Sequence, residues 1–114
     1  MRSEIVAFLK EINIKSDMPT VSEAEDRLCA AVNAGKKLGA GAVKIIHGYG
    51  SSGKGGKIRT AVRKKARELG KTVICGEDFS IFNEDTRHAF KVCPDLRKDD
   101  DLDRHNNGIT IIII

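Results

Sequence analysis

Apolar residues along the chain alternate between the spacing of strands and the spacing of helices. Residues 12–15 alternate apolar and polar side chains, as a short strand does, and Ala42–Ile46 is an almost unbroken apolar run, which is typical of a buried strand. Between them, residues 20–39 carry apolar side chains at helical spacing, and Thr20 stands three residues before Glu23, as in a capping box. The first half therefore predicts a strand, a helix and a second strand.

The second half continues this alternation. Apolar positions predict a helix from about Gly56 to Gly70, a strand at Thr72–Cys75 and a short helix within residues 83–92. Residues 109–114 form a β-branched strand that ends in four consecutive isoleucines, which leave no polar face for water and predict a position inside the sheet. This order predicts an α/β fold, a two-layer sandwich with a mixed four-stranded sheet and helices on one face.

We expect a single domain over residues 12–114. At 114 residues the chain is long enough to bury a core without disulfides. Residues 1–11 form an N-terminal extension whose pattern fits a helix or a strand extension. An insertion spans about residues 83–107, of which residues 94–107 read as a charged, flexible excursion.

A glycine-rich loop follows the second strand and opens the basic helix. A right-handed strand-helix-strand crossover makes the first two strands parallel, so this loop and the end of the first strand, near Lys15, share the carboxyl edge of the sheet. Glycines let backbone N–H groups approach phosphate oxygens closely, and the first turn of the next helix adds unpaired donors. The loop therefore predicts a site for a phosphate-bearing ligand.

Two sharper motifs fit part of the same loop. Residues 48–53 match the GxGxxG spacing of dinucleotide binders, but the 36 residues after Asp78 are too few and too polar for the second half of that fold. Residues 48–54 also fit the phosphate loop of nucleoside triphosphatases, except that Gly55 stands where a hydroxyl should hold Mg²⁺. Both motifs are disfavoured, and we expect no cofactor.

The charge of the chain is divided between two segments. The formal net charge is +4, and eight basic residues stand against the single acid Glu68 between residues 54 and 71. From residue 77 to residue 105, nine acids stand against five lysines and arginines. A basic helix beside a phosphate-binding loop favours a polyanion, since each neutralised phosphate adds affinity through counterion release, while the alternative is a solvated helix face.

The cysteines and the lengths of the apolar runs indicate the cellular compartment in which the protein is expected. Cys29, Cys75 and Cys93 lack the spacing of a zinc site and cannot all pair, so we expect reduced cysteines in the core. No apolar stretch is long enough to cross a bilayer and no signal-peptide pattern is seen, so we expect a cytoplasmic protein without a membrane partner. The aspartates around residues 99–105 are a candidate metal site, but aspartates in a turn are usually solvated, and we expect no metal.

Several segments resemble the small MutS-related (Smr) domain. Residues 45–50 followed by residues 58–62 look like its IHGxG and LRxxV signature. Residues 20–24 resemble the TVEEA opening of its first helix, and residues 108–111 resemble its GVTIV last strand. The resemblance covers roughly residues 12–114, and it implies a fold like the C-terminal domain of translation initiation factor three, with binding or nicking of DNA or RNA.

The chain departs from this family where the chemistry should lie. Nucleolytic members carry an LDxH motif on the first strand, whereas this chain has Asn13 and Lys15 at the positions of the acid and the histidine. The glycine-rich loop is also longer than the family turn. Asn13 carries no charge, and Lys15 is a poor base at neutral pH. His47 remains as a tentative catalytic residue, with a structural role in the loop as the alternative.

These features together predict a domain that binds the phosphate backbone of DNA or RNA without cutting it. The alternatives are a weak endonuclease using His47 and a binder of a nucleotide or phosphate ligand. A homodimer and docking to another protein both stay open. Tyr49 is a candidate for stacking on a base. The expected nucleic-acid contacts are Lys15, His47, Gly48, Tyr49, Gly50, Ser51, Lys54, Lys57, Arg59 and Arg63.

Overall fold

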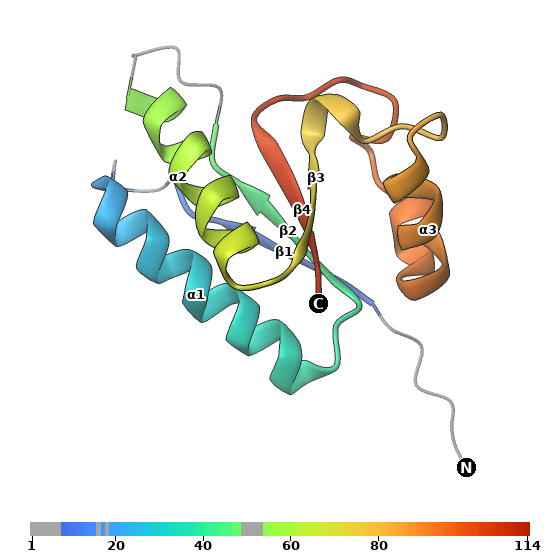
Figure 1. Cartoon of the computed structure of the whole chain (residues 1–114), viewed down its shortest axis with the longest axis horizontal. Coiled ribbons are helices and arrows are strands. Elements are labelled where there is room, and N and C mark those ends of the chain that lie inside the picture. The colour runs from blue at the N-terminus through green and yellow to red at the C-terminus, as the bar shows by residue number, and fades with distance from the viewer. Residues whose placement is uncertain (1–7, 16, 18, 49–53) are drawn as a thin grey trace.

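The computed structural model describes residues 8–15, 17, 19–48 and 54–114, with the side chains of residues 54 and 55 left aside (Figure 1). Helices and strands alternate along the chain, as the sequence predicts. In chain order they are β1 (Leu9–Asn13), α1 (Val21–Leu38), β2 (Ala42–Ile46), α2 (Lys54–Glu68), β3 (Thr72–Cys75), the 3-10 helix η1 (Gly76–Asp78), α3 (Glu84–Val92), the 3-10 helix η2 (Pro94–Lys98) and β4 (Ile109–Ile113).

The four strands form one mixed sheet in the order β1-β2-β4-β3. β1 pairs with β2 in parallel, and β4 lies between β2 and β3, antiparallel to both. The four-stranded mixed sheet and the internal position of the isoleucine strand are therefore confirmed. Ile109, Ile111 and Ile112 are almost fully buried because both faces of β4 are covered.

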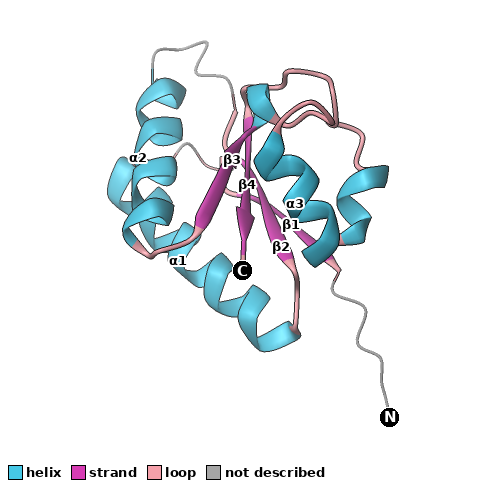
Figure 2. Ribbon diagram, turned by 45° about the vertical axis from the view of Figure 1, so that its right-hand side comes forward, coloured by secondary structure: helices cyan, strands magenta, loops and turns pink. Residues whose placement is uncertain are grey.

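α1 and α2 cover one face of the sheet (Figures 1 and 2). Leu28 and Val62 from these helices pack against Val43, Ile45 and Ile112 from the strands. A capping box begins α1 and a glycine ends it. The Thr20 side chain accepts from the Glu23 N–H while the Glu23 carboxylate accepts from the Thr20 N–H, and Gly39 closes the helix with φ +78°.

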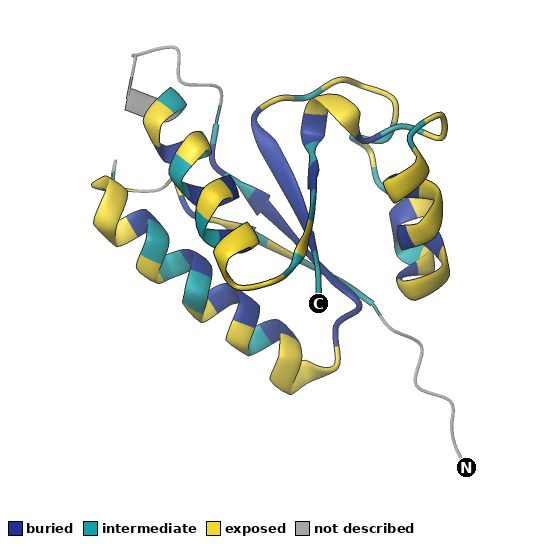
Figure 3. Cartoon of the chain, in the orientation of Figure 1, coloured by how far each residue is buried: buried dark blue, intermediate teal, exposed yellow. Residues whose placement is uncertain are grey.

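The opposite face of the sheet is covered by the insertion and by Phe79, which precedes it. Phe79, Phe90 and Leu96 pack there against Ile74 and Ile111, and α3 and η2 contribute to this second cluster. The expected α/β sandwich is confirmed for α1 and α2, whereas α3 lies on the other side of the sheet. The inward positions of α3 could be read from the spacing of its apolar residues, but that spacing does not say which face of the sheet they reach. Figure 3 shows the two central strands, β2 and β4, buried between helices whose outer faces are exposed.

Two boundaries differ from the sequence analysis. β1 begins at Leu9, so residues 9–11 pair with β2 and are part of the sheet rather than of an N-terminal extension. α2 begins at Lys54, two residues before the predicted start. Within the described residues, no helix is long and apolar enough to cross a membrane.

A buried lysine ties the acidic part of the insertion to the sheet. Lys44, in the middle of β2, is 4% exposed, and its Nζ lies 2.9 Å from Oδ1 of Asp99. It also pairs with Asp101, and with Glu11 of β1 at 3.6 Å. Residues 94–107 are therefore anchored by buried ion pairs and by Leu96, rather than forming the free excursion that their composition suggested.

Candidate functional site

The carboxyl ends of β1 and β2 meet at one edge of the sheet. The Ile14 N–H donates to the Ile46 carbonyl at 3.0 Å, which continues the pairing of the two strands beyond β1. A Cβ placed on Gly48 would lie 3.6 Å from Cδ of Lys15, so the lysine stem lies directly against this glycine. The predicted proximity of Lys15 to the start of the glycine-rich loop is confirmed, and the Lys15 side chain is exposed there.

Gly48 begins the loop in a conformation that favours glycine. Its φ is +85°, in the left-handed region that costs other residues energy. The N–H groups of His47 and Gly48 both donate to the Gly108 carbonyl, each at 3.0 Å. These two N–H groups therefore fasten the end of β2 to the turn before β4, and their hydrogen bonds are made inside the protein rather than to a phosphate.

His47 is enclosed at this edge and uses both ring nitrogens inside the protein. It is 2% exposed, with Nδ1 3.0 Å from the Gly48 carbonyl oxygen and Nε2 2.8 Å from Oγ1 of Thr110. Since a carbonyl oxygen only accepts, Nδ1 carries the proton and Nε2 accepts from the Thr110 hydroxyl. Burial, followed by the charges of Arg63 and Arg59, lowers the pKa of His47 to about 4, although its bond to Gly48 opposes the change. His47 is therefore neutral at pH 7.

Arg63 completes the same hydrogen-bond chain. Its Nε donates to Oγ1 of Thr110 at 2.9 Å, and its two terminal nitrogens donate to the Glu77 carboxylate at 3.0 and 2.9 Å. One of them also donates to the Ile109 carbonyl at 3.1 Å. Burial acts to raise the pKa of Glu77, but the hydrogen bonds and charge of Arg63 outweigh it and lower that pKa.

This bonding changes the role expected of two candidate residues. Arg63 is only 8% exposed and its guanidinium is paired, so its charge is used to hold α2 against β4 and η1. His47 joins that network through Thr110. We therefore interpret both residues as structural supports of the edge.

Among the described residues, cations that reach the solvent near this edge include Lys15 and residues of α2. Lys57 is exposed and Arg59 is half-buried in the first turns of α2, which begins at the edge that carries Lys15. Lys57 and Lys64 also line a shallow groove between α1 and α2, of about 530 Å³, together with Val21, Glu25, Gly56, Thr60 and Ala61. Tyr49, Gly50 and Ser51 lie outside the described residues, as does the side chain of Lys54.

The acidic cluster does not form a metal site in the described part of the chain. No group of three or more potential ligands comes together there. Asp99 and Asp101 instead neutralise Lys44. A basic residue inside an apolar strand is the sequence signal that could have predicted this pairing, because a buried charge requires a partner.

Comparison with known proteins adds no family to this picture. No family model, no curated protein and no solved structure matches the chain significantly.

Proposed function

We propose that this domain binds the phosphate backbone of nucleic acid at the carboxyl edge of β1 and β2. The observation that carries the proposal is the position of the Lys15 side chain next to Gly48, where the paired strands β1 and β2 end. A cation from the first strand therefore stands beside Gly48, the last described residue before α2. Lys15, Lys57 and Arg59 then supply charge to phosphates along one strand of nucleic acid.

The distribution of charge on α2 favours a polyanion over a single phosphate. Lys57, Lys64 and Arg67 are exposed along the helix, well beyond the reach of one phosphate group at its start. The acids of these two helices are Glu23, Glu25 and Asp26 at the start of α1 and Glu68 at the end of α2, and Glu25 lines the groove with Lys57 and Lys64. A series of exposed cations along a helix neutralises several phosphates at once and releases several counterions.

The resemblance to the Smr domain supports binding, and the residues of the edge argue against cleavage. Asn13, at the family's acidic position, accepts a hydrogen bond from the Lys15 N–H through Oδ1 at 2.9 Å, so its side chain shapes the end of β1. The imidazole of His47 is neutral, enclosed and bonded at both nitrogens. A general acid or base must reach its substrate within hydrogen-bond distance, which these contacts disfavour.

A salt titration tests the proposal. Binding of labelled single-stranded and double-stranded DNA and RNA is measured by fluorescence anisotropy at several salt concentrations, with a mononucleotide for comparison. We expect a steep decline of affinity with salt for at least one polymer, and negligible affinity for the mononucleotide. Equal, weakly salt-dependent binding of the mononucleotide would instead support the phosphate-ligand alternative.

Two matched pairs of substitutions locate the site. Lys15→Ala with Lys57→Ala should reduce the salt slope by up to about two units, one for each lost phosphate contact. The control, Lys36→Ala with Lys37→Ala, removes the same charge from the far end of α1, where both lysines are exposed, and should leave the slope nearly unchanged. Cleavage of the same substrates with Mg²⁺ or Mn²⁺ that disappears in His47→Ala, while the variant still binds them, would favour the endonuclease alternative.

A further inference from the structure

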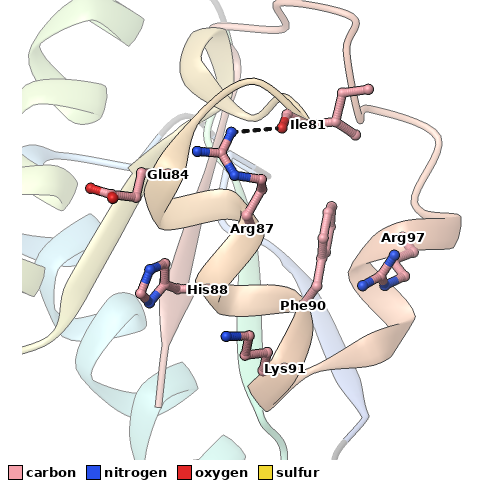
Figure 4. A pocket seen from close by; sticks show the side chains of 7 residues that line it. All are labelled: Ile81, Glu84, Arg87, His88, Phe90, Lys91 and Arg97. Atoms are coloured by element: carbon pink, nitrogen blue, oxygen red, sulfur yellow. Dashed lines mark hydrogen bonds between the residues drawn. The ribbon is translucent and has the colours of Figure 1, made fainter.

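A second candidate surface lies on α3, on the side of the sheet opposite α1 and α2 (Figures 1 and 2). A groove of about 520 Å³ runs between α3, η2 and the chain before α3. Figure 4 shows side chains from all three segments around it. The lining residues are Ile81, Glu84, Arg87, His88, Phe90, Lys91 and Arg97.

The charge of this groove is positive, although the segment that carries it is acidic overall. Arg87, Lys91 and Arg97 stand against Glu84 alone among its lining residues. Positions 84, 87, 88 and 91 share one face of α3 because they are spaced by three and four residues. In the described part of the chain, Lys91 has no hydrogen-bond or ion-pair partner. Its charge is therefore available to an acidic ligand.

Two large apolar side chains before α3 face solvent: Ile81, which lines the groove, and its chain neighbour Phe82. Phe82 is 84% exposed and Ile81 is 45% exposed, immediately before α3. Phe90 forms the floor, and the guanidinium carbon of Arg97 lies 4.7 Å from its ring centroid. An aromatic ring that is almost fully exposed gains nothing for the fold of the chain itself, and aromatic side chains with arginines are typical of the energetically dominant centres of protein interfaces.

We propose that the α3 groove is a docking site for an acidic peptide segment of a partner protein, anchored by an aromatic or branched aliphatic side chain. Carboxylates of the peptide meet Arg87, Lys91 and Arg97, and its apolar anchor packs against Phe82 and Ile81. The complementary charge sets the orientation of the peptide and speeds its association, while the anchor supplies most of the affinity.

The mixture of side chains favours a peptide over a second nucleic-acid surface. Ile81 supplies a branched aliphatic surface, which packs well against protein side chains and offers no flat face to a base. The groove is also separated from Lys15 and Lys57 by the sheet, so the two surfaces can be occupied independently.

The test uses a displayed library of random peptides of about twelve residues, selected on the full chain. We expect enriched peptides to be rich in Asp and Glu and to contain an aromatic or branched aliphatic anchor. Their affinities are then measured by anisotropy on the unmodified chain, on Lys91→Glu and on Phe82→Ala. Both side chains are exposed, so both variants should fold.

Each substitution should weaken an enriched peptide by about tenfold or more, whereas the matched variant Lys37→Glu on α1 should change its affinity by less than about twofold. Selection that yields no enriched peptides, or peptides without acidic residues, would overturn the proposal, as would equal affinity for Lys91→Glu. Loss of DNA or RNA binding in Lys91→Glu without loss of peptide binding would assign the groove to nucleic acid. A dimer that dissociates in Phe82→Ala would assign it to a second copy of the chain.

Discussion

Removal of the Lys44 charge should destabilise the fold far more than removal of an exposed lysine. The perturbation is Lys44→Met, which keeps an unbranched side chain of similar length in the middle of β2 but removes the cation. Asp99, whose side chain is 7% exposed, and Asp101, at 21%, would then face each other without their counterion. An unpaired buried charge costs about 3–5 kcal/mol. For a chain of this length we expect a fall in Tm of roughly 10–20 °C.

The pH dependence of this effect follows from the pKa shifts. Burial acts to lower the pKa of Lys44 and to raise that of Asp101, but the hydrogen bonds and charges of the pair outweigh burial, so the pKa of Lys44 is raised and that of Asp101 is lowered. Asp101 therefore stabilises the fold above its ordinary pKa of 3.8, and this stability is lost as the pH falls through the lowered value. The cost of Lys44→Met should shrink in acid, where the carboxyls are protonated and need no partner.

The assay is urea unfolding followed by circular dichroism, at neutral and acidic pH. Lys37→Met serves as the control, since this lysine is exposed and its substitution should change stability by less than about 0.5 kcal/mol. The triple variant Lys44→Met, Asp99→Asn, Asp101→Asn removes all three charges and should recover most of the loss. The reasoning is refuted if Lys44→Met costs less than about 1 kcal/mol, or if the triple variant is no more stable than the single one.

Three further perturbations test the contacts around the edge of the sheet. Gly76→Ala should destabilise the chain by about 3 kcal/mol or more, because the added Cβ would lie 1.8 Å from the Asn106 carbonyl oxygen. Gly56→Ala, whose Cβ would meet no atom within 4 Å, is the control in the same urea assay. Thr110→Val should cost about 2–4 kcal/mol because it leaves the Nε group of Arg63 and the Nε2 atom of His47 without their shared partner, whereas Thr110→Ser should keep most of the stability. His47 should stay neutral down to about pH 4 in an NMR titration. Because its pKa is lowered from 6.5, the unfolded chain takes up this proton first, and the free energy of unfolding should fall by up to roughly 3 kcal/mol between pH 6.5 and 4. This loss should be absent in His47→Gln.

The order of elements could be predicted because each carries a local signal. The capping box of Thr20 and Glu23, the stop at Gly39 and the isoleucines of β4 all act over a few residues, and the structure confirms them. The face that α3 covers could not be predicted in this way, since its inward positions fit either side of the sheet. Such a choice depends on contacts between residues far apart in sequence.

The partners of buried charges could not be predicted from the sequence either. The sequence shows that Lys44 is a basic residue in an apolar strand, but its pairing with Asp99 joins residues 55 positions apart. The same holds for Arg63, which looked like one more cation of a basic helix and is instead bound to Glu77 and Thr110. By contrast, the proximity of Lys15 to Gly48 follows from strand order alone, because parallel neighbouring strands bring their carboxyl ends together.

The most direct test of the proposed interface is NMR mapping of amide signals during titration with a short DNA or RNA duplex and its single strands. The account predicts that signals of Ile14, Lys15 and Gly48, together with those of Lys57 and Arg59, shift at low salt and return toward their free positions as salt is added. Signals of α3, on the other side of the sheet, should stay in place. Shifts confined to α3, or a spectrum that no nucleic acid changes at low salt, would contradict the account.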